Sequence, residues 1–182
     1  PFLLGSLSVF SYQPFNFSLI NFLILPSLFY LIVLINKKSK GIYRKKPLRK
    51  NFFLFGTSLG FGYYLAGLFW ITNSLTFDES FKYLIPFALI IIPLFLSLFF
   101  SVITVLVAPF LSMNFTSLLL ISSSFSISDF LRSKILTGFP WNLWSYSFSW
   151  ATELLQILNI LGLYAFNLIV ITFFFSTYNF IL

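Results

Sequence analysis

Two short stretches of the sequence combine residue types that could do chemistry. Gly56-Thr-Ser-Leu-Gly60 has the G-x-S-x-G spacing of the turn that presents a nucleophilic serine in α/β-hydrolases. Such a serine needs a general base, normally a histidine, and this chain contains no histidine. We therefore interpret Gly56 and Gly60 as a small-xxx-small pattern for close helix packing in a membrane, with Gly67 on roughly the same face.

The second stretch is Asp129-Phe-Leu-Arg132, in which an acid and a base lie three residues apart. On a helix this spacing puts both side chains on one face, where they can form an ion pair. Ionisable groups at the end of a membrane helix indicate a functional site, and a guanidinium is well shaped to hold a lipid phosphate. The alternative is an ion pair that only orients the helix at the interface, and the spacing leaves both open.

Other catalytic constellations are missing from the sequence. The absence of cysteine and histidine excludes disulfides, a thiol nucleophile, a histidine base and His/Cys metal sites within this chain. There is also no pair of carboxylates and no glycine-rich phosphate loop. We therefore expect no catalytic residue, no metal and no cofactor in these 182 residues.

The elements that must position these residues are membrane helices. The chain is 59% hydrophobic and 8% charged, whereas a soluble domain carries about a quarter charged residues. Residues 51–77, 83–128 and 154–182 contain no charge, and a membrane-spanning helix needs about 20 mainly apolar residues. The sequence predicts an all-α integral membrane protein, a polytopic bundle of about six transmembrane helices with the first truncated. The predicted spans are 1–12 (partial), 17–35, 51–75, 83–108, 115–131 and 151–176.

One loop holds most of the positive charge and predicts the orientation. Residues 36–50, NKKSKGIYRKKPLRK, contain eight of the eleven basic residues and no acid. Because cytoplasmic loops of membrane proteins are enriched in Lys and Arg, we expect this loop in the cytoplasm, beside the bilayer surface, and residues 132–150 on the outer side. A nucleic-acid patch is the alternative for a basic tract, but its place between two spans favours the topology signal. Arg132 and Lys134 then lie on the outer side, against the rule.

The stretch LTGFPWNLWSYSFSW, residues 136–150, holds three of the four tryptophans and no charge. Trp and Tyr favour the membrane–water interface, because their rings are apolar and their N–H or O–H groups need partners. We expect Trp141, Trp144, Tyr146 and Trp150 near headgroup level on the outer face. A plain interfacial belt and a lipid-facing wall of a site both fit this pattern.

Several segments together resemble the apolipoprotein N-acyltransferase family. The first is FGTSLGFGYYLAGLFWI, residues 55–71, a glycine-rich stretch that contains Trp70 next to its end. Asp129-Phe-Leu-Arg132 and the Thr-Gly-Phe-Pro-Trp turn that ends at Trp141 follow it. The step GLYAFN at 162–167 and the segment FSYQPF near the start also match, so the resemblance covers essentially the whole chain. Because the chain begins at Pro1 and stops within an apolar run, we also expect a fragment.

The resemblance implies an activity and a division of the family's chain. The family transfers an acyl chain from a membrane phospholipid to the amino group of a diacylglyceryl cysteine on bacterial lipoproteins, through a cysteine thioester in a nitrilase-like domain. That domain would lie beyond residue 182. The resemblance implies a monomer in the bacterial inner membrane, with the phospholipid donor, the lipoprotein acceptor and the bilayer as partners and without nucleic acid. The residues expected to face lipid or substrate are Trp70, Asp129, Arg132, Pro140, Trp141 and Trp144.

A non-catalytic scaffold, a partner subunit or a transporter is the alternative function. Transport would favour a charge-lined path near the middle of the membrane, ideally built from an internal repeat. Pro86 and Pro93 interrupt a predicted span, but no charge lies near its middle and no repeat is visible. A cysteine-bearing domain that follows residue 182 would decide for the enzyme.

Overall fold

The structure is a computed structural model that describes residues 1–40, 45–135, 140 and 142–177. Within these residues every regular element is a helix. The elements are α1 (Phe2–Leu7), η1 (Ser8–Ser11), η2 (Ser18–Ile20), α2 (Asn21–Lys40), α3 (Lys45–Leu68), η3 (Phe69–Thr76), η4 (Glu79–Leu84), α4 (Ile85–Val107), η5 (Ala108–Phe110), α5 (Phe115–Ile135), η6 (Trp144–Phe148), α6 (Thr152–Leu155), α7 (Leu158–Leu161) and α8 (Leu163–Ser176). The predicted all-helical class is confirmed for the described part of the chain.

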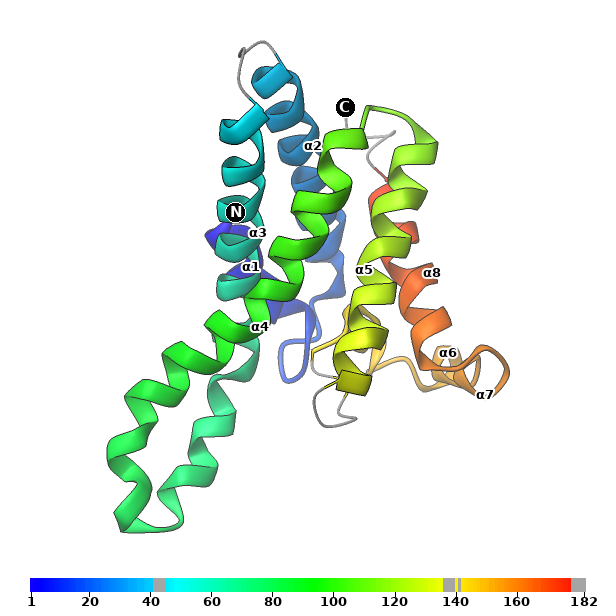
Figure 1. Cartoon of the computed structure of the whole chain (residues 1–182). Helices are drawn as coiled ribbons and strands as arrows, with labels where there is room; N and C mark the ends of the chain where they lie inside the picture. Colours follow the sequence, from blue (N-terminus) through cyan, green and yellow to red (C-terminus); the bar gives the residue numbers. More distant parts are fainter. Residues whose placement is uncertain (41–44, 136–139, 141, 178–182) are drawn as a thin grey trace.

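The helices run between two ends that differ in composition. One end, which we call the basic end, contains the last turn of α2, the first turn of α3, the α4–α5 turn and the end of α8 (Figure 1). The other end, which we call the aromatic end, contains the turn after η1, the last turn of α5, η6, α6 and α7. The chain thus passes between these two ends, and the side of the membrane on which each end lies stays a prediction.

Three helical segments are long and apolar enough to cross a membrane: Ser18–Ser39, Arg49–Thr76 and Glu79–Phe110. They correspond to the predicted spans 17–35, 51–75 and 83–108. The serine-rich α5 has 21 residues, and Phe2–Ser11 and Leu163–Ser176 are shorter apolar helices. The count of about six spans therefore stays a prediction.

The predicted span 151–176 is divided in the structure. Residues 152–161 form only the short helices α6 and α7, and a regular helix begins at Leu163. Gly162 separates them with φ 76° and ψ 165°, a backbone conformation that glycine adopts without the steric penalty of a Cβ atom. The 14 residues of α8 rise about 21 Å, less than the hydrocarbon core of a bilayer. The expectation of one continuous helix over 151–176 is wrong.

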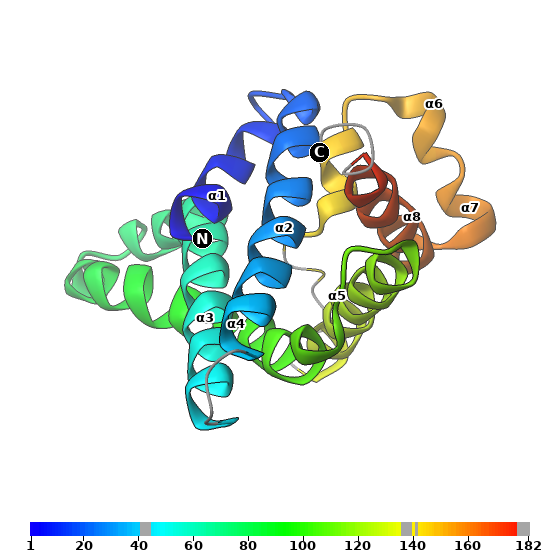
Figure 2. The same ribbon diagram turned by 90° about the horizontal axis from the view of Figure 1, so that it is seen from above.

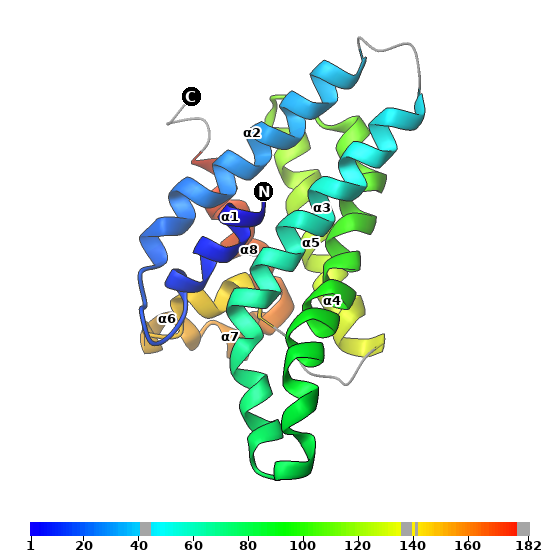
Figure 3. The same cartoon turned by 90° about the vertical axis from the view of Figure 1, so that its left-hand side faces the viewer.

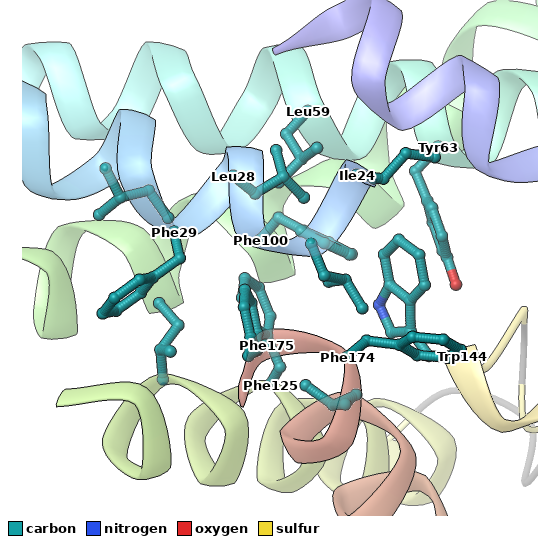
Figure 4. Packing of buried hydrophobic residues seen from close by; sticks show 14 of the residues in the cluster. Ile24, Leu28, Phe29, Leu59, Tyr63, Phe100, Phe125, Trp144, Phe174 and Phe175 are labelled. Carbon is teal, nitrogen blue, oxygen red and sulfur yellow. The ribbon is translucent and has the colours of Figure 1, made fainter. Parts of the chain in front are cut away.

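Helix α2 lies in the middle of the bundle. Seen from above, α1 and α3 lie on one side of it and α8 and η6 on the other (Figure 2). The buried cluster around it joins side chains from five helices and η6, which interdigitate in the close-up view (Figure 4). Its labelled members are Ile24, Leu28, Phe29, Leu59, Tyr63, Phe100, Phe125, Trp144, Phe174 and Phe175.

Helices α3 and α4 pack closely along their length, and glycines and hydroxyls allow the approach. A Cβ atom added to Gly60 would lie 2.8 Å from Ser97 Cα, and one added to Gly56 would lie 2.6 Å from Ser101 Cα. The Thr104 hydroxyl donates across the interface to the Phe52 carbonyl at 2.8 Å. Beyond this contact η3 and η4 continue as a hairpin that projects past the other helices at the aromatic end (Figure 3).

Candidate functional site

A buried ion pair lies in the last two turns of α5, toward the aromatic end. Arg132 Nη2 donates to Asp129 Oδ1 at 2.9 Å. Arg132 is 1% exposed and Asp129 is 8% exposed. A charge in such surroundings is tolerated when it is paired and hydrogen-bonded. Neither side chain faces lipid, so of the two roles expected for this pair, direct contact with the surrounding lipid is wrong.

Asn167 of α8 connects this pair to η6. Its Nδ2 donates to the second carboxylate oxygen of Asp129 at 3.0 Å, and its Oδ1 accepts from the Ser145 backbone N–H at 3.0 Å. One amide therefore joins α5, α8 and the start of η6. Sequence reasoning noted Asn167 only within the GLYAFN step, although an isolated amide in an apolar helix is itself a signal of an interhelical hydrogen bond.

Two adjacent tyrosines of α3 complete the buried cluster. The guanidinium of Arg132 lies over the Tyr64 ring, 5.1 Å from its centroid, in the geometry of a cation–π contact. Tyr63 donates its hydroxyl to the Asn142 carbonyl and accepts a 2.5 Å hydrogen bond from the Tyr12 hydroxyl. Sequence reasoning missed these tyrosines, because their partners come from distant parts of the chain. We call Tyr63, Tyr64, Asp129, Arg132 and Asn167 the polar cluster.

The polar cluster contacts the aromatic segment 142–150 and holds it against the bundle. Trp144 is 2% exposed and packs its ring against Tyr63, with 4.8 Å between the centroids. The expectation that Trp144 faces lipid is therefore wrong, because it belongs to the core (Figure 4). Trp70 and Trp150 are both more than half exposed, and Trp141 lies outside the described residues.

Tyr146 and Pro140 lie beside this segment. The Tyr146 hydroxyl donates to the Pro140 carbonyl at 3.0 Å, and Pro140 is partly buried. Burial raises the pKa of Tyr146 to about 12, so the hydroxyl remains a donor at neutral pH. This hydrogen bond ties η6 to Pro140.

A cavity of about 580 Å³ opens at the aromatic end. Its walls are Val9, the turn at 12–15, the end of α3, the start of η3 with Trp70, and the side chains of Asn142, Tyr146 and Ser149. The indole N–H of Trp70 donates to the Gly67 carbonyl at 3.1 Å, which holds the ring beside the opening. A Cβ atom on Gly67 would clash with the Asn142 amide. Gly67 thus packs against a turn, unlike Gly56 and Gly60, which pack against a helix.

The chemistry available here is binding and positioning. Across the described residues, no group of three His, Cys, Asp or Glu side chains is placed to hold a metal ion. The Asp129 carboxylate already accepts hydrogen bonds from Arg132 and Asn167. The ion pair therefore serves to position these side chains. The cavity at the aromatic end is largely apolar, with the polar side chains of Tyr12, Gln13, Asn142, Tyr146 and Ser149 at its wall. Such a lining suits a ligand that is mainly hydrocarbon with a polar end.

Comparison with known proteins gives a consistent match. Residues 4–175 match the family model of the apolipoprotein N-acyltransferase N-terminal domain. The chain is 33% identical over 173 residues to an apolipoprotein N-acyltransferase of Bradyrhizobium diazoefficiens, covering 94% of this chain and 31% of that protein. It is 34% identical over 173 residues to the Rickettsia prowazekii protein of the same name, covering 93% of this chain and 32% of the relative.

The chain therefore spans about a third of the length of the curated relatives that it matches. The family match covers nearly all of the described helices, including α3, α5 and the aromatic segment. The chain belongs to the apolipoprotein N-acyltransferase family, of which it carries the N-terminal domain.

Proposed function

We propose that residues 1–182 form the membrane base of an enzyme that transfers an acyl chain from a phospholipid to the N-terminal diacylglyceryl cysteine of a lipoprotein. The family match over residues 4–175 supports the reaction class. Three long apolar helices support a place in the membrane. The basic end would lie in the cytoplasm and the aromatic end in the periplasm, because eight of the eleven basic residues fall in segment 36–50, where α2 ends and α3 begins.

The covalent steps fall to residues beyond this segment. The thioester mechanism implied by the family needs a cysteine thiolate, and residues 1–182 contain no cysteine. A cysteine thiolate would attack an ester carbonyl of the phospholipid, forming a thioester and releasing a lysophospholipid. The amino group of the lipoprotein cysteine would then attack the thioester, forming an amide and releasing the thiol. By itself, the segment 1–182 would be inactive.

The observation that carries the proposal is the cavity at the aromatic end. Its apolar walls and its position at the predicted membrane surface suit the acyl chain of a lipid that enters sideways. Trp70 would contact this lipid, while Asp129, Arg132 and Trp144 would act by holding segment 142–150 in place. Pro140 lies at the same end of the domain, and we expect Pro140 and Trp141 to line the mouth.

Size and activity of the native protein test the reaction. Mass spectrometry of membranes from the source organism should find a product much larger than 21.1 kDa, with cysteine-bearing peptides that follow residue 182. That product, purified and mixed with phospholipid and a diacylglyceryl lipopeptide, should add one acyl chain to the peptide amine. A native product that ends near Leu182 would contradict the proposal and favour a partner role.

A tryptophan pair tests the role of the cavity. In the full-length enzyme we expect Trp70→Ala to reduce acyl transfer about tenfold at unchanged protein level, since it removes the ring at the cavity wall. Trp150→Ala is the matched control, because Trp150 is equally exposed but lies outside the cavity. Equal activity of both variants would exclude the cavity as the lipid contact.

A further inference from the structure

A second apolar hollow lies on the outer surface of the bundle, between α4 and α5. It has a volume of about 570 Å³ and almost no polar surface. Helix α4 contributes the wall from Phe95 to Val107, and α5 contributes the wall from Ser124 to Ile135. We call this hollow the α4–α5 groove. It is separate from the cavity at the aromatic end, with which it shares no lining residue.

The length and direction of the groove match one leaflet of a bilayer. From Ser124 to Ile135 the helix rises about 17 Å. The hydrocarbon core of a bilayer is about 30 Å thick, so this length is close to half of it. Because Ile135 is at the aromatic end of α5, the groove runs from that membrane surface toward the middle of the bundle (Figure 1).

An exposed lysine lies beside the surface end of the groove, next in sequence to the lining residue Ile135. Lys134 is exposed, lies three residues after the groove residue Leu131 and directly precedes Ile135. Among the described residues the ion pairs are Asp129 with Arg132 and Glu79 with Lys82, so no carboxylate there partners Lys134. Its ammonium lies 5.7 Å from the centroid of the ring of Phe130, a neighbour of the groove that packs against Tyr164 of α8. The predicted topology places Lys134 on the outer side of the membrane, where the positive-inside rule does not account for a lysine.

We propose that the α4–α5 groove binds a phospholipid, with one acyl chain along the groove and the phosphate against the Lys134 ammonium. The apolar walls recognise the chain and the lysine recognises the anionic phosphate, since a basic side chain near the surface attracts anionic lipid. The phosphate also explains why a lysine is placed on the outer side against the usual bias. This inference needs α4 and α5 in a bilayer but does not depend on acyl transfer.

Lipid retention by the full-length protein tests the site. Native mass spectrometry would compare phosphatidylglycerol with a diacylglycerol of the same chains, which lacks the phosphate. Lys134→Gln should lower retention of phosphatidylglycerol about fivefold and leave diacylglycerol unchanged, because only the phosphate contact is lost. Leu131→Trp, which fills the groove, should lower retention of both lipids.

Two controls separate this site from general lipid binding. Lys82→Gln removes an exposed lysine at the tip of the projecting hairpin and should leave the retention of both lipids unchanged. A photoreactive amino acid at position 131 should form adducts with lipid. Equal retention by Lys134→Gln and Lys82→Gln would overturn the proposal. Adducts with a protein segment in place of lipid would overturn it as well, since another helix would then fill the groove.

Discussion

Two ion pairs in this molecule share the same sequence spacing and have different surroundings. Asp129 with Arg132 and Glu79 with Lys82 each place an acid three residues before a base on a helix. The side chains of Arg132 and Asp129 are 1% and 11% exposed, whereas those of Lys82 and Glu79 are 47% and 89% exposed. The first pair lies inside the bundle and the second at the tip of the projecting hairpin (Figure 3).

The difference between the pairs lies in their further partners. Asp129 also accepts from Asn167 of α8, and Arg132 also covers the ring of Tyr64 of α3. The described residues provide Glu79 and Lys82 with no such contacts from other helices. A buried charge that loses its partner has no water to replace it, while an exposed charge is rehydrated at once. The spacing in the sequence shows that a pair can form, and the surroundings decide what it does.

Removing the guanidinium of the buried Arg132 should have the largest effect on the free energy of unfolding. Arg132→Met leaves the Asp129 carboxylate buried beside a neutral side chain, and we expect it to lower the free energy of unfolding by about 3–5 kcal/mol. Titration of the full-length protein in mixed micelles with a denaturing detergent, followed by tryptophan fluorescence, measures this change. The double variant Asp129→Leu with Arg132→Met should lose less than the single variant, because no uncompensated charge remains. A larger loss in the double variant would contradict the comparison.

The aromatic partner of Arg132 should rank second. Tyr64→Leu removes the ring beneath the guanidinium and part of the core packing, so we expect a loss of about 2–3 kcal/mol in the same titration. Tyr64→Phe is the matched control, since it keeps the ring and removes a hydroxyl that has no hydrogen-bond partner among the described residues. A loss in Tyr64→Phe as large as in Tyr64→Leu would show that the hydroxyl, and not the ring, stabilises the cluster.

Asn167 should rank third, because it supports the pair without carrying charge. Asn167→Leu leaves one oxygen of Asp129 and the N–H of Ser145 without their present partner, and we expect a loss of about 1–2 kcal/mol. Because Asn167 also holds η6, the variant should expose Trp144, which a red shift of tryptophan emission would detect. Asn159→Leu, in the exposed helix α7, is the control and should change neither property. An unshifted emission in Asn167→Leu would show that other contacts hold η6.

The sequence was sufficient for the features that depend on local spacing. The charge-free stretches predicted an all-helical chain, and the i, i+3 spacing predicted that Asp129 and Arg132 can pair. The glycines at 56 and 60 predicted a close helix contact, and α4 lies there. These features are visible in the sequence because neighbours on one helix face are set by the helix period alone.

The features that depend on distant partners were not predictable in the same way. Trp144 was expected at the membrane interface, but Tyr63, 81 residues earlier in the chain, holds it in the core. The expected helix over 151–176 is interrupted at Gly162, whose positive φ is a property of the fold that apolar composition does not reveal. The roles of Tyr64 and Asn167 likewise arise only when α3, α5 and α8 come together.

Substitutions in the exposed pair Glu79 with Lys82 should have the smallest effect on the free energy of unfolding, and they serve as the control for the buried pair. Lys82→Ala and Glu79→Ala each remove one member of a pair that water surrounds, so we expect no measurable change in the free energy of unfolding. Because a surface pair is also screened by ions, the titration should give the same midpoint for the wild type and both variants at low and at high salt. A loss in either variant as large as that of Arg132→Met would mean that the hairpin tip is covered in the full-length protein. The two pairs would then differ in their partners and no longer in their exposure.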